Sequence, residues 1–113
     1  MLYSWKGLIM KIEIVEQGAK TLRKETREIR EDLQDILEKL ELGLSLGLPH
    51  VRPLTNIYKN LYEIRVKDRK GQFRVIYFLK KKDAIYIVHA FRKKAQKLPE
   101  KEKKLILKRL KEI

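Results

Sequence analysis

The first half of the chain alternates between polar and apolar positions and then takes on a helical period. Alternation over residues 11–15 predicts a short strand, and Gly18 is expected to separate it from the next element. Further on, apolar positions recur at steps of three and four, which predicts one long amphipathic helix ending near Gly43. Residues 49–53 begin and end with proline and predict a stiff connection. The buried stripe of the helix would comprise Leu22, Thr26, Ile29, Leu33, Ile36, Leu37 and Leu40.

In the second half the hydrophobic period changes to two. Three alternating segments, 61–67, 72–80 and 84–91, are separated by short polar turns and predict an antiparallel meander. Pro99 suits the first position of a final helix. The whole pattern predicts an α+β fold, in which the N-terminal strand and the three-strand meander form a small antiparallel sheet. This sheet would pack against the N-terminal helical segment, with a C-terminal helix after it.

Length and composition indicate one domain. A chain of 113 residues with 43% apolar residues can form a single core, so we expect one domain over residues 1–113. Met10 is a second candidate start, and residues 1–10 are expected to be a flexible leader. The start lacks the apolar core of a signal peptide, and no apolar run is long enough to span a bilayer. We therefore expect a cytoplasmic protein with no membrane partner.

Cysteine and histidine usage excludes several kinds of site. The chain has no Cys, which excludes disulfides, a thiolate nucleophile and a cysteine metal site. Its two histidines, His50 and His89, are far apart in sequence, which argues against a structural zinc site. No cluster of carboxylates indicates a catalytic metal, and no cofactor is expected.

The net charge of +13 comes entirely from the second half of the chain. Residues 1–56 carry nine Lys/Arg and nine Asp/Glu, whereas residues 57–113 carry nineteen Lys/Arg and six Asp/Glu. A cationic surface of this strength attracts phosphate backbones and holds them electrostatically. A lysine-rich, thermophile-like surface would explain abundant charge of both signs, but not an excess in one half. The distribution favours a nucleic-acid partner.

The turn between the first two strands of the meander determines which side chains share a face. If Lys67 pairs with Gln72 across a four-residue turn, apolar residues face apolar residues along both strands. The same register puts Arg65 directly opposite Arg74. A slip of two residues would instead set Lys67 opposite Arg74, and a three-residue turn would invert one strand and scatter these cations.

The third strand extends this group of cations. Either short-turn register brings His89 or Phe91 beside Arg74, and the chain then leaves the sheet through a basic run. Elsewhere the same face would carry apolar residues that a helix covers, namely Ile76, Phe78, Ile85 and Ile87. The expected cluster at one end of the face comprises Arg65, Lys67, Arg74, His89, Phe91, Lys93 and Lys94.

These side chains suit RNA cleavage without a metal. Like charges facing each other across strands are destabilising, which indicates that an anion binds between them. Guanidinium and ammonium groups can hold a scissile phosphate and offset the charge that grows on it. His89 titrates near neutral pH and is the natural proton carrier, while Phe91 could stack on an unpaired base. The substrate's own 2′-hydroxyl would attack the neighbouring phosphate.

The candidate residues fall into two groups. The candidate catalytic residues are Arg65, Arg74, His89, Lys93 and Lys94. The candidate RNA-binding residues are Lys67, Phe91, Arg92 and Lys97. Each has a structural alternative, because a histidine can be a hydrogen-bonded core residue and basic residues are common on surfaces. The sequence leaves open which residue is the general base.

Four segments carry a resemblance to a known family. They are residues 49–54 (PHVRPL), 61–66 (LYEIRV), 73–78 (FRVIYF) and 89–99 (HAFRKKAQKLP), in matching order and spacing. With them, the stretch from Leu48 to about Pro99 resembles the phage-derived, HigB-like branch of the RelE/ParE toxin superfamily. The resemblance implies a small α+β domain and a toxin that cuts messenger RNA, often on the ribosome, without a metal. Family functional positions would fall on Arg65, Arg74 and the Lys93–Lys94 pair, with His89 and Phe91 nearby.

The resemblance also implies partners and leaves alternatives open. The expected partners are mRNA, the ribosome and an antitoxin of acidic or helix-turn-helix type, in a toxin–antitoxin hetero-oligomer. Some RelE-type toxins use a tyrosine soon after the basic pair, whereas this chain has none there. Either His89 takes that role or the activity is weaker. ParE-type relatives inhibit DNA gyrase instead, and a non-catalytic RNA-binding module is a further alternative.

Overall fold

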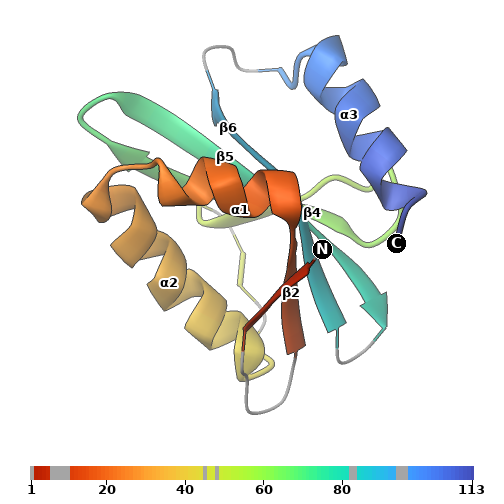
Figure 1. Ribbon diagram of the computed structural model, residues 1–113, viewed down its shortest axis with the longest axis horizontal. Helices are drawn as coiled ribbons and strands as arrows, with labels where there is room; N and C mark the ends of the chain where they lie inside the picture. Colours follow the sequence, from red (N-terminus) through yellow and green to blue (C-terminus); the bar gives the residue numbers. More distant parts are fainter. Residues whose placement is uncertain (1, 6–10, 45, 48, 82–83, 94–96) are drawn as a thin grey trace.

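The computed structural model of the chain describes residues 2–5, 11–44, 46–47, 49–81, 84–93 and 97–113, and for residues 2–5, 11, 15–18, 81 and 93 it describes the backbone alone. Within these residues the chain forms a twisted sheet with helices on both faces (Figure 1). In chain order the elements are β1 (Leu2–Trp5), β2 (Lys11–Val15), α1 (Glu16–Arg23), α2 (Arg27–Glu41), β3 (Val51–Pro53), β4 (Leu61–Asp68), β5 (Gly71–Lys81), β6 (Ala84–Lys93) and α3 (Glu100–Leu110).

The strands form one six-stranded sheet in the order β1-β2-β6-β5-β4-β3. The predicted α+β class and the antiparallel meander β4–β5–β6 are confirmed. The sheet has two additional edge strands, β1 and β3, and β2 pairs with β6 in parallel rather than antiparallel. Of the expected leader, residues 1 and 6–10 lie outside the described residues, while residues 2–5 form β1. In the part of the chain that the structure describes, no helix is both long and apolar enough to cross a membrane.

The predicted N-terminal helix is two helices, and Thr26 lies at the break between them. Its backbone is extended (φ −62°, ψ 156°) and its hydroxyl accepts a hydrogen bond from the Ile29 amide, so it caps α2. The helical period had predicted that Thr26 belongs to the buried stripe, and this prediction is wrong. Gly18 lies inside α1 rather than before it. Gly43 follows the end of α2 with φ 78°, a conformation that glycine adopts without strain.

Each face of the sheet has its own apolar cluster. On one face α1 and α2 cover the larger cluster, and α2 contributes its predicted stripe from Ile29 to Leu40. On the other face the fully buried Ile106 of α3 belongs to a second cluster with Ile76 and Val88 of the sheet. This second helix layer covers only part of its face, because the β4–β5 hairpin extends beyond α3 (Figure 1).

A β-bulge in β6 changes which residues lie on the α3 face. Ile76 pairs with His89, but the adjacent Tyr77 pairs with Ile87, so Val88 is an extra residue in β6. Because of this extra residue, the side chains of residues 84–87 lie on the opposite faces of the sheet from those that a regular strand would give them. Ile85 and Ile87 therefore pack under α1 and α2, and the prediction that they share a face with Arg74 is wrong. Ile76 and Phe78 do lie under α3, as predicted.

Candidate functional site

Two arginines lie side by side on the α3 face, beyond the end of the helix. The predicted register of the hairpin is confirmed: Lys67 pairs with Gln72, and Arg65 pairs directly with Arg74. Asp68 pairs with Gly71, whose φ of 125° allows the tight turn between the strands. The short turn and the matched apolar positions thus set two guanidinium groups next to each other.

A buried carboxylate lies between the two guanidiniums. Glu63 Oε1 is 3.4 Å from Arg74 Nε and 3.9 Å from Arg65 Nε. The side chains of Glu63 and Arg74 are only 2% and 3% exposed, whereas that of Arg65 is 32% exposed. Burial lowers the pKa of Arg74, and Glu63 opposes this effect. Gln72 accepts a further hydrogen bond from the Arg74 guanidinium. Arg74 is therefore the fixed inner member of the pair and Arg65 the outer, accessible one.

Arg52 adds a third guanidinium that the sequence analysis missed. It lies in β3, directly opposite Glu63, and is exposed. Together with Arg65 it further lowers the pKa of Arg74. The proline on each side of this segment indicated a loop, but Pro53 is tolerated because β3 is an edge strand. Three guanidiniums thus gather around Glu63, and the local charge stays positive.

His89 is held by two side chains of α3. Arg109 Nη1 lies 2.7 Å from His89 Nδ1 and also donates to the Val88 carbonyl at 2.8 Å. Because a guanidinium can only donate, Nδ1 is the acceptor, and Nε2 carries the proton that faces Glu102. Burial lowers the pKa of His89, the contact with Glu102 raises it, and Arg109 lowers it. The imidazole is therefore neutral at pH 7, with both nitrogens engaged.

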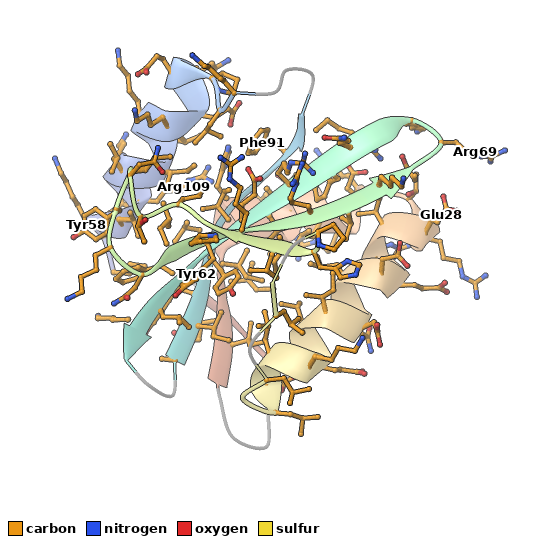
Figure 2. All side chains as sticks on the ribbon, turned by 180° about the vertical axis from the view of Figure 1, so that it is seen from behind. Glu28, Tyr58, Tyr62, Arg69, Phe91 and Arg109 are labelled. Carbon is orange, nitrogen blue, oxygen red and sulfur yellow. The ribbon has the colours of Figure 1, made fainter. Side chains whose placement is uncertain are left out.

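Phe91 connects the histidine with the arginines. It pairs with Arg74 across β5 and β6, as one of the predicted registers required, and its ring stacks on His89 with centroids 5.3 Å apart. Figure 2 shows Phe91 between the β4–β5 hairpin and α3, with Arg109 on the helix. The half-buried ring leaves an aromatic surface beside the guanidiniums.

The predicted lysines differ in what the structure shows of them. Lys67 is exposed on β4, one position beyond Arg65 on the same face. Lys97 is exposed just before α3. The backbone of Lys93 ends β6 opposite Gln72, but its side chain is not described, and Lys94 lies outside the described residues.

Arg92 does not join this cluster, which corrects its expected place among the RNA contacts. It points to the α1 and α2 face, where it donates to Asp68 at 2.7 and 2.8 Å and to Glu25 at 2.6 Å. Its guanidinium also lies 5.6 Å from the centre of the Phe73 ring. Arg92 therefore ties the hairpin to the α1–α2 junction, and two carboxylates match its charge.

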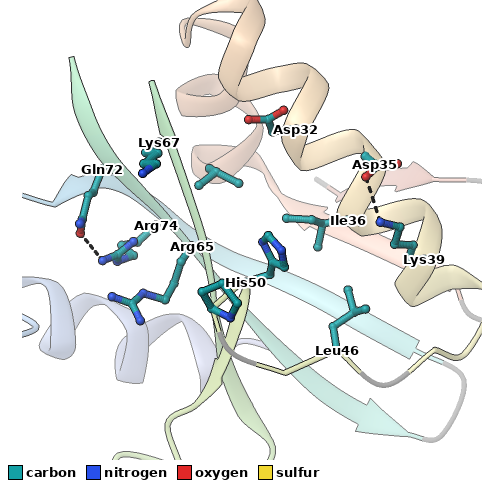
Figure 3. A pocket seen from close by; sticks show the side chains of 12 residues that line it. Asp32, Asp35, Ile36, Lys39, Leu46, His50, Arg65, Lys67, Gln72 and Arg74 are labelled. Carbon is teal, nitrogen blue, oxygen red and sulfur yellow. Dashed lines mark hydrogen bonds and ion pairs between the residues drawn. The ribbon is translucent and has the colours of Figure 1, made fainter. Parts of the chain in front are cut away.

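A cavity of about 510 Å³ begins at the arginine pair and continues around the edge of β4 to α2 (Figure 3). Arg65, Lys67 and Arg74 form its basic wall, and residues of α2, including Asp32 and Asp35, form the opposite wall. The cavity opens here because β3 pairs with residues 62–64 only, and among the described residues no strand continues beside β4 on that side. Among the described residues, no group of three His, Asp or Glu side chains is placed to hold a metal ion.

A match to a protein-family model identifies the family of the chain. Residues 20–111 match the family model described as phage-derived protein Gp49-like (DUF891). The chain belongs to the Gp49-like family. This family is a RelE-related, toxin-like family, which agrees with the resemblance in the sequence at this coarser level. No curated protein matches the chain significantly.

The Gp49-like match spans α2, the meander and α3, and so includes every candidate residue of the site. The site has members that the sequence did not single out: Glu63 between the arginines, Arg52 on β3, and Glu102 and Arg109 on α3. Glu63 alternates with Arg65 and Lys67 along one strand, and this was a usable signal that all three share a face. No comparable local signal relates α3 to His89.

Proposed function

We propose that this Gp49-like chain is the HigB-like toxin of a toxin–antitoxin pair, and that it inhibits translation by cleaving mRNA at the ribosome without a metal. The toxin-like character of the family supports the general class. The observation that carries the nuclease proposal is the direct pairing of the partly exposed Arg65 with the buried Arg74 at the wall of the cavity. Glu63 offsets only part of the charge of the neighbouring guanidiniums, and the remaining positive charge favours the binding of a phosphate.

In this proposal the two arginines differ in their tasks. Arg74 is buried and oriented by Glu63 and Gln72, so it presents a preorganised charge to the scissile phosphate. Arg65 is partly exposed and closes on the phosphate from the side of the cavity. Lys93 and Lys94 would supply further positive charge, as the family resemblance implies. Together these groups offset the negative charge that grows on the phosphate in the transition state.

The proposed reaction is an intramolecular transesterification of the RNA phosphodiester. The 2′-hydroxyl oxygen of the substrate forms a bond to the adjacent phosphorus, and the bond from phosphorus to the 5′-oxygen of the next nucleotide breaks. The products are a 2′,3′-cyclic phosphate and a 5′-hydroxyl. The 2′-hydroxyl proton passes to the carboxylate of Glu102, which His89 positions through its Nε2–H. The Glu102 carboxyl group then gives this proton to the leaving 5′-oxygen.

The RNA chain would follow the remaining basic residues. Lys67 and Lys97 are exposed and would bind flanking phosphates, and Phe91 would stack on an unpaired base. An antitoxin with an acidic segment would cover the same surface, because opposite charge speeds docking and fixes its register.

The test is a translation reaction with a defined mRNA, followed by analysis of the RNA ends. We expect 2′,3′-cyclic phosphate or 3′-phosphate ends, because a metal-activated water would leave 3′-hydroxyl ends instead. Arg65→Ala should lower the cleavage rate about 100-fold or more, since removing one group that stabilises transition-state charge typically has this effect. Arg27→Ala, which removes an equal charge from an 86% exposed side chain of α2, is the matched control and should cleave normally.

The two rival functions give different results in the same reactions. A gyrase inhibitor would cleave no RNA and would block DNA supercoiling by purified gyrase, with or without Arg65→Ala. A non-catalytic RNA-binding module would bind the mRNA but leave it intact. Intact mRNA after translation with the wild-type protein contradicts the proposal.

A further inference from the structure

The cavity beside the arginine pair has walls of opposite charge. Its sheet wall carries Arg65, Lys67 and Arg74, and its helix wall carries Asp32 and Asp35 (Figure 3). A free phosphate is attracted to the first wall and repelled by the second. The arrangement suits a ligand with an anionic group at one end and hydrogen-bond donors at the other.

The acidic wall is accessible. Asp32 and Asp35 are exposed on successive turns of α2, three residues apart, and so point in similar directions. Asp35 contacts Lys39 at 3.2 Å, but both side chains of this pair are about half exposed or more, so the contact is weak and readily exchanged. Both carboxylates can therefore accept hydrogen bonds from a bound molecule.

The space between the walls suits a flat ring. Ile36, Leu46 and Val66 provide apolar surface, and Pro49 and His50 provide ring faces. The volume of about 510 Å³ lies within the range of about 300–1,000 Å³ that is typical of small-molecule sites. A nucleobase has the size and the two apolar faces that such a space accommodates.

The uncovered edge of β4 adds main-chain groups to this space. The Arg65 amide donates to the His50 carbonyl at 2.8 Å, so the main-chain N–H and C=O groups of Arg65 point toward this edge of β4. Two residues on, those of Lys67 point the same way, and no described strand pairs with Lys67 on that side. A nucleotide held at Arg65 could reach around this edge and place its base between β4 and α2.

We propose that this cavity binds the base next to the scissile phosphate and selects a base that carries an amino group, with guanine preferred; this inference rests on the function proposed above. Guanine presents N1–H and N2–H side by side to a carboxylate, as Asp32 or Asp35 would require. Adenine and cytosine offer one amino group each. Uracil offers a lone N–H between two carbonyls, which a carboxylate repels. The cavity therefore gives the toxin a preference at one nucleotide of the cleavage site.

The first experiment measures binding and needs no cleavage. The full-length protein is titrated with each of the four ribonucleoside 5′-monophosphates, and binding is followed by calorimetry or by NMR shifts. We expect GMP to bind about tenfold more tightly than UMP, with AMP and CMP between them, as for a good bidentate base contact. Arg65→Ala should weaken all four equally, because it contacts the shared phosphate.

A variant pair tests the acidic wall. The double variant Asp32→Asn, Asp35→Asn should bring the GMP-to-UMP affinity ratio close to one. Glu28→Gln with Glu38→Gln removes the same charge from exposed positions of α2 outside the cavity and should keep the ratio. Thermal unfolding of both variants checks that the fold is intact.

Each outcome decides the question. Equal affinities of the four nucleotides for the wild-type protein overturn the proposal, and this is the result expected if the cavity instead takes an extended protein segment along the β4 edge. A ratio that survives the Asp32 and Asp35 replacements, or is lost in the control as well, also overturns it. The failure of the proposed function looks different, because there the wild-type protein discriminates GMP from UMP yet leaves translated mRNA intact.

Discussion

Arginine has two different environments on the two faces of this sheet. On the α1 and α2 face, Arg92 donates to Asp68 and Glu25 and lies against the Phe73 ring. On the α3 face, Arg65 and Arg74 pair across β4 and β5, and both lie near Glu63. The first environment matches charge with charge, while the second leaves an excess of positive charge at the wall of the cavity.

The difference teaches which arginine serves the fold and which serves a ligand. Arg92 holds down the pKa of Asp68 well below its usual range, with help from Thr26, so these groups favour the folded state. Burial lowers the pKa of Arg74, Glu63 opposes this effect, and the neighbouring Arg65 and Arg52 add to it. A sequence search for basic residues ranks these side chains alike. Only the side chains around each arginine distinguish its role.

The largest expected effect is on stability and comes from the core beneath α1 and α2. Phe73 is fully buried under α1 and α2, and Phe73→Ala should lower the free energy of unfolding by about 3–5 kcal/mol. Denaturant unfolding measures this change. RNA cleavage per folded molecule should persist, because Phe73 points away from the arginine pair.

Removing Arg92 should also cost stability without affecting the chemistry. Arg92→Ala leaves Asp68 and Glu25 without their guanidinium partner and should lower the thermal midpoint clearly. The control is Arg27→Ala, which breaks an exposed pair with Glu31 and should change the midpoint little. Loss of cleavage by folded Arg92→Ala protein would show that the two faces are not separate in function.

Predicting Arg65 opposite Arg74 from sequence was possible because local rules set it. A short polar turn and apolar matching across β4 and β5 leave few registers. The bulge at Val88 and the contacts of His89 with Glu102 and Arg109 depend on how α3 packs, and no local pattern encodes that.

The helical segment shows the same limit. Thr26 fits the apolar period of one long helix, yet it caps α2 and donates to Asp68 at 2.7 Å, forty-two residues away. The tertiary partner makes a break favourable where the period predicts continuity. Similarly, β3 is recognisable only as the partner of β4, because its three residues, which end in Pro53, give no strand pattern of their own.

A smaller effect concerns pH. Because burial lowers the pKa of His89, the folded protein binds fewer protons than the unfolded chain in the range just below pH 6.5. The contribution of His89 to stability should therefore be complete above about pH 6.5 and decrease as the pH falls toward the lowered pKa of the folded state. Urea unfolding of the wild type and of His89→Gln between pH 7 and pH 5 measures it. An identical pH dependence in both proteins would contradict this assignment.

The smallest expected effect is that of Arg65→Ala on stability. This change removes both the repulsion from Arg74 and the 3.9 Å contact with Glu63, which oppose each other, so the free energy of unfolding should change by no more than about 0.2–1 kcal/mol. Chemical denaturation in low salt measures this difference, because salt screens the repulsion. A clear loss of stability would mean that Arg65 serves the fold, as Arg92 does.

The central claim is that Arg65 and Arg74 bind one scissile phosphate together. A double-mutant cycle on the mRNA cleavage rate tests it most directly, with Arg65→Ala, Arg74→Lys and the double variant. Lysine at position 74 keeps a positive charge beside the buried Glu63 but removes the fork of the guanidinium. We predict that each single change lowers the rate strongly and that the double variant is little slower than the worse single one. Strictly additive losses, or a normal rate in Arg65→Ala, would contradict the claim.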